Sequence, residues 1–315
     1  SWSMPAGEAL LSIDSVVQVR VNVRMDDRRK LRLDLRLATG FVPGQSVNGT
    51  VLRERSLGIH RFEDIVLDGP NPIPASLVLP CNVQPNAPVV LYCHGQPGDR
   101  GLGRRELLDG SSYLQSPAYG PALANMGFAS LAIDMPGFGA RQDEAGASLG
   151  DCLNDLSRAV GYLWQRSEGG FARVFVLGQS MGAAHAVWLA ALDDRIEACA
   201  HMCMLADVGP LIEAGAEARL DPSLRVPEVP GMCEMGDVAG LINGPQLICH
   251  GGQDPLTPPR ARAAAIARVR AAYESTAGVL ETFLDPEAGH VESAPMRVAV
   301  LDFLARAAKR PAFFA

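Results

Sequence analysis

The sequence predicts an α/β protein with a mostly parallel, doubly wound sheet, an N-terminal β extension and a short lid-like insertion. Short continuous apolar runs bounded by turn residues indicate strands that are buried on both faces of a parallel sheet. Segments with helical spacing lie between these runs, and this alternation is typical of βαβ units. The chain has 315 residues, 48% of them hydrophobic and 20% charged, so it can bury a large core.

Alternating apolar and polar residues near the N-terminus predict half-buried strands. Apolar residues occupy every second position over 17–23 and again over 31–37, and the polar stretch 25–29 suits a hairpin loop between them. The first three residues precede Met4 and resemble an expression scar, so we expect Met4 to be the native start. The residues that follow lack the charged-then-apolar pattern of a secretory signal.

A second antiparallel pair of strands is expected just before the parallel sheet. These strands cover 62–67 and 75–79 and are joined by a proline-rich turn at 70–74. We therefore divide the chain into an N-terminal β extension, residues 1–60, and a main domain, residues 61–315. Two roles are open for the extension: it continues the sheet, or it packs on the sheet to form a homodimer.

The main domain alternates between apolar runs and helical segments. The runs that predict parallel strands cover 88–93, 129–133, 174–177, 198–205, 246–249 and, more weakly, 280–284. The helical segments cover about 113–126, 149–166, 181–192, 258–274 and 293–309. Residues 206–243 interrupt this alternation with four prolines and one short helical piece near 211–219. Such an insertion is often a lid or binding loop; the alternative is a surface crossover without a role in binding.

Composition and charge exclude several classes of function. The net charge is −7, whereas nucleic-acid binding requires clustered Lys and Arg. No run of about 18 uncharged apolar residues is present, so no membrane span is expected.

The seven cysteines are scattered, several in apolar runs, which suits reduced thiols in the cytoplasm. Cys199, His201 and Cys203 could be interpreted as metal ligands, but they lack a second ligand pair, so we expect them to be buried and expect no metal.

The motif Gly-x-Ser-x-Gly occurs twice, around Ser180 and around Ser148. A nucleophile elbow must follow a buried strand and open a helix, which leaves the serine hydroxyl exposed on a tight turn. Ser180 meets this condition, because the apolar run at 174–177 precedes it and a helical segment follows. No strand precedes Ser148, which is predicted to be the N-cap of the next helix, with Asp151 in its first turn. Ser180 is therefore the predicted nucleophile.

A serine nucleophile needs a base and an acid that orients it, and after a nucleophile elbow these follow in the order acid, then His. Asp254 lies in a turn at the carboxyl end of a predicted strand, where such sheets place functional groups. Of the six histidines, only His290 follows this aspartate. We predict Asp254 as the orienting acid and His290 as the base. Asp207 and Asp285 are the rival acids.

Two backbone N–H groups are needed to stabilise the tetrahedral oxyanion. One comes from the residue after the nucleophile, Met181. The second is expected in the loop after the first buried strand, His94-Gly95-Gln96-Pro97-Gly98. Pro97 has no N–H, so Gln96 is the predicted donor. His94 and Asp134 are expected to stabilise their own loops.

The loop at 94–98, the loop at 134–139, the Ser180 elbow, Asp254 and His290 together resemble the α/β-hydrolase superfamily over residues 60–310. The stretch 237–242, which leads into the strand before Asp254, is similar to the branch of dienelactone hydrolase-like and acetyl xylan esterase-like proteins. Dienelactone hydrolases proper use Cys where this chain has Ser180. The resemblance implies that 61–315 is a catalytic domain that needs no cofactor or metal.

The function that this resemblance implies is a serine esterase acting on a small-molecule ester through an acyl-enzyme on Ser180. The same triad admits lactone, thioester or C–C bond hydrolysis and acyl transfer, because a fold does not determine the reaction. A non-catalytic small-molecule binder is disfavoured, since such proteins usually lose a member of the triad and this chain retains all three.

Overall fold

The computed structural model describes residues 25–84, 87–96, 98–144, 146–166, 171, 173–213, 215 and 233–311. Its centre is a nine-stranded sheet with the order β1-β2-β3-β5-β4-β6-β7-β8-β9. The strands are β1 (Gly49–Leu57), β2 (His60–Leu67), β3 (Ile73–Leu79), β4 (Val89–Cys93), β5 (Ala129–Ile133), β6 (Val174–Gln179), β7 (Ile196–Met202), β8 (Gln246–Gly251) and β9 (Leu280–Asp285). The helices are α1 (Met25–Thr39), α2 (Glu106–Asp109), α3 (Tyr119–Asn125), α4 (Leu149–Gln165), α5 (Met181–Leu192), α6 (Val208–Glu213), α7 (Met235–Gly240), α8 (Pro259–Tyr273) and α9 (Ala294–Ala308).

The six apolar runs form the parallel part of the sheet, from β5 at one side to β9 at the other. This confirms the predicted fold class. The largest differences from the predicted boundaries lie at the end of β7 and the start of α3. Strand β7 ends at Met202 rather than at residue 205, and α3 begins only at Tyr119, because Pro117 cannot occupy the interior of a helix.

The predicted strand at 31–37 is wrong, because these residues form part of helix α1. In a half-buried strand these leucines would share one face and be buried alike, but Leu35 is fully buried whereas Leu33 and Leu37 are 52% and 81% exposed. The stretch 25–29 is accordingly the first turn of α1 and not a hairpin loop. The other predicted strand of this pair, at 17–23, lies outside the described residues.

Three arginines of α1, one per helical turn, explain why this segment is a helix. Arg28 and Arg32 donate hydrogen bonds to the carbonyls of Gly240 (2.5 Å) and Leu241 (2.6 Å) at the end of α7, and Arg36 donates to that of Leu192 (2.9 Å) at the end of α5. Helix C-termini carry unpaired carbonyls and partial negative charge, which cations stabilise. In a helix, residues four positions apart lie on the same face one turn above another, which brings the three guanidinium groups to these carbonyls.

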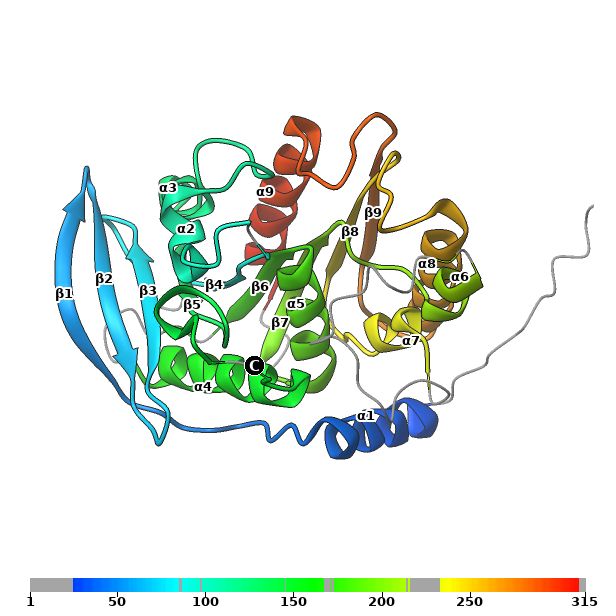
Figure 1. The fold of residues 1–315 in the computed structure, drawn as a ribbon, viewed down its shortest axis with the longest axis horizontal. Helices are drawn as coiled ribbons and strands as arrows, with labels where there is room; N and C mark the ends of the chain where they lie inside the picture. Colours follow the sequence, from blue (N-terminus) through cyan, green and yellow to red (C-terminus); the bar gives the residue numbers. More distant parts are fainter. Residues whose placement is uncertain are drawn as a thin grey trace, which may run out of the picture.

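The strands β1, β2 and β3 form an antiparallel extension of the parallel sheet. They lie at the left edge of Figure 1, with β1 outermost. The pair β2 and β3 was predicted from the sequence and is confirmed. Strand β1 was not predicted, because its centre, Arg53-Glu54-Arg55, is exposed and shows no apolar alternation. The homodimer remains a prediction.

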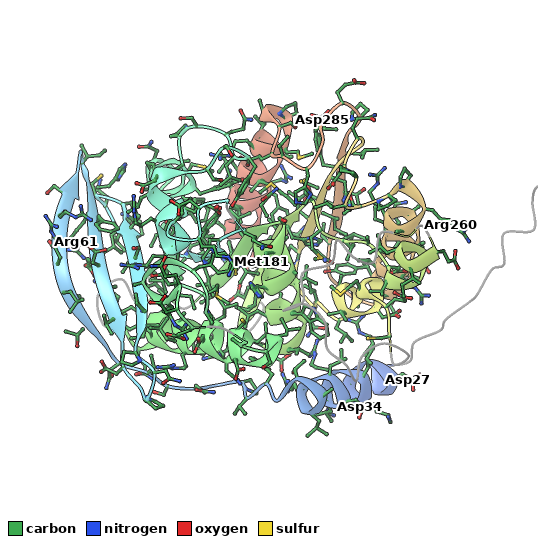
Figure 2. All side chains as sticks on the ribbon, viewed as in Figure 1. Asp27, Asp34, Arg61, Met181, Arg260 and Asp285 are labelled. Atoms are coloured by element: carbon green, nitrogen blue, oxygen red, sulfur yellow. The ribbon has the colours of Figure 1, made fainter. Side chains whose placement is uncertain are left out.

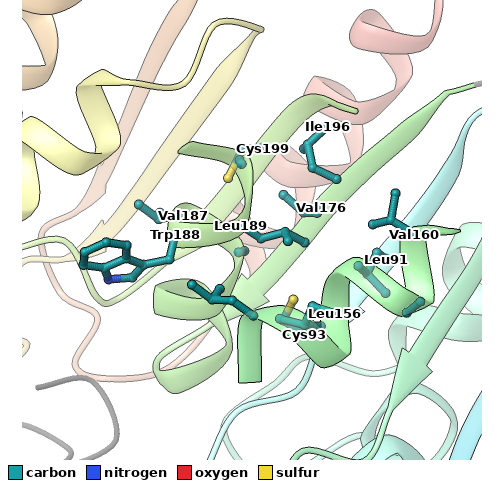
Figure 3. Packing of buried hydrophobic residues seen from close by; sticks show 14 of the residues in the cluster. Leu91, Cys93, Leu156, Val160, Val176, Val187, Trp188, Leu189, Ile196 and Cys199 are labelled. Carbon is teal, nitrogen blue, oxygen red and sulfur yellow. The ribbon is translucent and has the colours of Figure 1, made fainter. Parts of the chain in front are cut away.

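Two hydrophobic layers cover the faces of the sheet. Residues of α1, α4 and α5 pack on one face, and residues of α2, α3 and α9 pack on the other. Figure 3 shows part of the first layer, where Leu156 and Val160 of α4 and Trp188 of α5 lie against the strands. Because both faces are covered, the carboxyl ends of the parallel strands are where side chains can converge on a ligand.

Candidate active site

Ser180 lies on the turn between β6 and α5. Its backbone angles are φ 56° and ψ −121°, a left-handed conformation that is uncommon for residues other than glycine. The Ser180 N–H donates to the carbonyl of Met202 at 3.0 Å, at the end of neighbouring β7. The geometry is that of a nucleophile elbow. Figure 2 shows the next residue, Met181, at the centre of the molecule, whereas Arg61 and Arg260 lie at its periphery.

The two glycines of the motif allow strand and helix to approach each other closely. A Cβ on Gly178 would lie 2.2 Å from the carbonyl oxygen of Gly182, and one on Gly182 would lie 2.0 Å from that of Cys93. Both distances are far below van der Waals contact with backbone atoms. The Gly-x-Ser-x-Gly pattern around Ser180 is therefore required by packing. The second motif has a different role: Ser148 caps α4 in a capping box with Asp151, as predicted.

The structure brings Ser180, His290 and Asp254 together from three loops. His290 Nε2 lies 2.7 Å from Ser180 Oγ, and His290 Nδ1 lies 2.9 Å from Asp254 Oδ2. Asp254 follows β8, and His290 follows β9. In this arrangement the Nδ1–H donates to the carboxylate, which leaves Nε2 free to accept the serine proton.

Asp254 is held as a carboxylate by its partners. Burial alone would raise its pKa, but the hydrogen bond and charge of His290 and the hydrogen bond from the Leu256 N–H outweigh this effect, and the pKa lies below its usual range. The rival acids are engaged elsewhere. Asp207 accepts hydrogen bonds from Arg268 Nε and the Gly236 N–H, both at 2.9 Å, and Asp285 accepts from the Glu287 N–H at 3.1 Å.

The loop after β4 lies beside the Ser180 turn. A Cβ on Gly95 would lie 3.3 Å from the carbonyl oxygen of Gln179. The Gly95 N–H already donates to Glu106 Oε1 at 3.0 Å. The N–H groups of Gln96 and Met181, by contrast, donate to no acceptor within the described part of the chain. The structure thus places the two predicted donor residues on adjoining backbone segments.

Comparison with known proteins agrees with this geometry. A family model described as the alpha/beta hydrolase fold matches residues 88–223. YtaP of Bacillus subtilis (strain 168), named as a candidate hydrolase, is 30% identical over 274 residues, which cover 82% of this chain and 91% of YtaP. The chain belongs to the α/β hydrolase family. The resemblance predicted from the sequence is confirmed.

Solved structures of esterases share the fold of this hydrolase. The acetyl xylan esterase from Paenibacillus sp. R4 is 23% identical with a TM-score of 0.61, covering 90% of this chain and 95% of its own. Acetyl xylan esterase 1 from Thermoanaerobacterium sp. JW/SL YS485 is 18% identical with a TM-score of 0.62, covering 90% and 94%. The glucuronoyl esterase from Solibacter usitatus is 14% identical with a TM-score of 0.63, covering 91% and 93%.

Four other histidines of the hydrolase are buried within the fold. The ring of His94 bridges two loops, with Nδ1 at 2.7 Å from the Gly95 carbonyl oxygen and Nε2 accepting from the Met135 N–H at 3.2 Å. His201 and His250 are buried inside β7 and β8, and burial lowers the pKa of each to about 3. His185 is buried in α5.

Asp134 stabilises its loop, as expected from the sequence. The carboxylate accepts hydrogen bonds from the backbone N–H groups of Arg104 (2.7 Å) and Ala140 (2.9 Å), and it pairs with the Arg104 guanidinium. It is fully buried, and the hydrogen bonds of His290 among the described residues go to Asp254 and Ser180 instead.

The seven cysteines are free thiols. His201 lies between Cys199 and Cys203 in sequence, but its Nε2 faces the Gln246 amide at 3.0 Å. Among the described residues, no group of three His, Cys, Asp or Glu side chains could hold a metal ion. Nor does any helix within the described ranges have the length and apolar character to cross a membrane.

The two ends of the 206–243 insertion are tied together. The Glu234 carboxylate accepts hydrogen bonds from the N–H groups of Val208 (2.6 Å) and Gly209 (3.1 Å). Helices α6 and α7 occupy these ends. Residues 214 and 216–232 lie outside the described residues, so the lid and the plain crossover both remain predictions.

Sequence reasoning missed two buried carboxylates near the site. Glu292, two residues after His290, accepts hydrogen bonds from Arg297 (2.7 Å) and the Gln115 N–H (2.8 Å). Glu106 lies under the loop after β4. Glu292 could have been found from the sequence, because it lies only two residues after the predicted base His290. Glu106 had no such signal, because its partners are assembled by the fold.

Proposed function

We propose that this hydrolase is a serine esterase that cleaves a carboxylic ester of a small or medium-sized substrate through an acyl-enzyme on Ser180. The observation that carries the proposal is the continuous hydrogen-bonded chain from Ser180 Oγ through His290 to Asp254, with distances of 2.7 and 2.9 Å. A nucleophile, a base and an orienting acid in this order are the requirements of acyl transfer to serine.

In the first half-reaction, Ser180 Oγ attacks the ester carbonyl carbon while His290 Nε2 takes the serine proton. The carbonyl oxygen becomes the oxyanion of a tetrahedral intermediate, which accepts hydrogen bonds from the Met181 and Gln96 N–H groups. Asp254 stabilises the imidazolium that forms. His290 then returns the proton to the alkoxide, so the alcohol leaves and the acyl group stays on Ser180.

In the second half-reaction, water replaces the alcohol. His290 removes a proton from the water, the hydroxide attacks the acyl carbon, and the proton passes to Ser180 Oγ as the acid leaves. These steps use side chains and backbone N–H groups only. The esterase names of the proteins that share the fold support a carboxylic ester as substrate. The cytoplasm as location and the division at residue 60 stay predictions.

The test is hydrolysis of a series of p-nitrophenyl esters, from acetate to decanoate, by the wild type and Ser180→Ala. We expect the wild type to turn over and Ser180→Ala to lose activity by a factor of about 10⁴ or more. The preferred acyl length then reports the size of the pocket.

Ser148→Ala is the matched control, since Ser148 lies in the same sequence pattern but caps α4. It should keep the activity and lose only about 1 kcal/mol of stability. A Ser180→Ala protein as active as the wild type would disprove the assigned nucleophile. A wild-type protein that hydrolyses none of these esters would contradict the proposed esterase activity.

A further inference from the structure

Glu106, the first residue of α2, is a fully buried carboxylate close to the site. Oε1 accepts hydrogen bonds from the Tyr92 hydroxyl (2.6 Å) and from the Gly95 N–H (3.0 Å), and Oε2 accepts from the Tyr113 hydroxyl. No ion pair between described residues involves Glu106. A carboxylate buried without a cation is costly unless hydrogen bonds compensate it, so three donors converging on Glu106 indicate a specific role.

Gly95 is held tightly between neighbours. A Cβ on Gly95 would lie 2.5 Å from the Tyr113 hydroxyl and 3.3 Å from the carbonyl oxygen of Gln179. The Tyr113 hydroxyl that bonds Glu106 therefore also presses against the Gly95 backbone. The loop thus lies close to Gln179, the residue that precedes Ser180, and a side chain at position 95 would not fit.

Both polar groups of the Gly95 backbone are engaged. The N–H donates to Glu106, and the carbonyl oxygen lies 2.7 Å from His94 Nδ1. The Gly95 carbonyl and the Gln96 N–H belong to one planar peptide group and point in opposite directions. Fixing Gly95 at both ends therefore fixes the direction of the Gln96 N–H.

Tyr113 also connects this loop to the loop that carries His290. Its backbone carbonyl accepts a hydrogen bond from the Glu292 N–H at 2.9 Å. Gln115 adds two bonds to Glu292, from its backbone N–H and from its side-chain amide, both at 2.8 Å. One short segment thus contacts both the Gln96 loop and the His290 loop.

We propose that Glu106 is a positioning residue for ester hydrolysis: through Gly95 it aims the Gln96 N–H at the oxyanion, and Tyr113 keeps this loop in register with His290. This inference rests on the proposed function. Removing one oxyanion donor typically costs about 10²–10³ in kcat. Glu106 acts through Gln96, so its loss should give a similar defect in kcat without a matching rise in KM.

The test compares Glu106→Met with Glu106→Gln in the full chain. Met has a similar volume but cannot accept the Gly95 hydrogen bond, whereas Gln retains an acceptor. The substrates are p-nitrophenyl acetate and its thionoacetate analogue, in which sulfur replaces the carbonyl oxygen. An oxyanion site built for oxygen favours the ester, so misplacing the Gln96 N–H lowers the ratio of the two kcat/KM values.

We expect Glu106→Met to lower kcat about 10²-fold and to reduce the ester preference at least several-fold. Glu106→Gln should restore most of both. The matched control is Glu197, a buried carboxylate at the amino end of β7, opposite to the end that carries the site, which accepts a hydrogen bond from Arg173 at 2.8 Å. Glu197→Met should lower the thermal midpoint but leave the ester preference unchanged.

A folded Glu106→Met protein with wild-type kcat and ester preference would overturn the inference. If Glu106→Met does not fold, Tyr113→Phe decides, because it removes only the hydroxyl against Gly95; an unchanged ester preference would then count against the proposal. The proposed function is judged separately, by whether the wild type hydrolyses esters and Ser180→Ala does not. If the wild type does not, the inference fails with it.

Discussion

The glycine residues around Ser180 bring backbone atoms into direct contact with other backbone atoms, and this packing defines the turn. Gly182, in the first turn of α5, lies directly against the end of β4, where a Cβ would lie 2.0 Å from the Cys93 carbonyl oxygen. Rotamer changes cannot relieve a contact between backbone atoms. The strand and the helix must move apart to admit a methyl group, and this movement would also displace Ser180.

Gly182→Ala should therefore destabilise the protein by about 3 kcal/mol or more, as overpacking against a fixed backbone does. Gly98→Ala is the matched control, because a Cβ there meets nothing within 4 Å. It should change the free energy of unfolding by less than about 0.5 kcal/mol. Urea unfolding of both variants measures the difference, and equal midpoints would contradict the close approach.

Helix α1 illustrates how distant partners select an element. Arg28, Arg32 and Arg36 lie one turn apart and bond carbonyls at the ends of α7 and α5. Figure 1 shows α1 along the lower edge of the molecule, beside α4 and α5. Four-residue spacing brings these bonds and the burial of Leu35 onto one face. Leu33 and Leu37, which would share a strand face with Leu35, point away from it.

Alanine substitutions distinguish this helix from the strand that alternation predicted. Leu35→Ala should cost about 2–5 kcal/mol, because the side chain is fully buried. Leu37→Ala should cost less than about 0.5 kcal/mol, because its side chain is 81% exposed. In a half-buried strand the two leucines would be equivalent. Similar losses of stability for both variants, measured by urea unfolding, would be inconsistent with α1.

The charged residues at the centre of edge strand β1 restrict how two copies of the chain could pair in the predicted homodimer. A second copy pairing antiparallel with β1 about a twofold axis would place residues opposite each other symmetrically around the axis. Centring the pair on Glu54 sets Glu54 against itself and Arg53 against Arg55, and centring it on either arginine sets that arginine against itself. Like charges directly opposite are destabilising. These three registers are therefore disfavoured for a dimer that pairs through this edge.

Two buried histidines make the stability of the whole molecule depend on pH. Burial lowers the pKa of His201 and His250 from 6.5 to about 3. Between these values the unfolded chain binds protons that the folded chain does not, so the free energy of unfolding falls as the pH decreases. Asp254 also lowers the free energy of unfolding as the pH decreases, but only at more acidic pH. There its carboxylate is protonated in the unfolded chain before it is protonated in the folded one.

Lowering the pH from 7 to 5 should reduce the free energy of unfolding by about 2 kcal/mol for each of these histidines. His250→Leu should remove one of the two contributions and flatten the profile accordingly. Urea unfolding at both pH values provides the measurement. If the variant loses as much stability as the wild type over this interval, His250 is not a neutral buried group in the folded protein.

Much of the parallel sheet and of the candidate site was predictable because the signals are local. Each of the six strands is a run of apolar residues between turns, and burial on both faces requires such a run whatever lies next to it. The pattern around Ser180 is equally local, since strand, elbow and helix occupy consecutive residues. Chain order then singled out Asp254 and His290, the two side chains that the structure brings to Ser180.

Other features depended on residues far apart in the sequence and only the tertiary structure decided them. The arginines of α1 bond carbonyls more than 150 positions away in the sequence. Nothing in the local sequence reveals these carbonyls, and the leucines at 31–37 by themselves have the pattern of a strand. Glu106 is recognisable only once the fold brings Tyr92, Gly95 and Tyr113 around it. The physical reason is that burial periodicity and turn geometry act over a few residues, whereas hydrogen bonds between segments exist only after the sheet has brought those segments together.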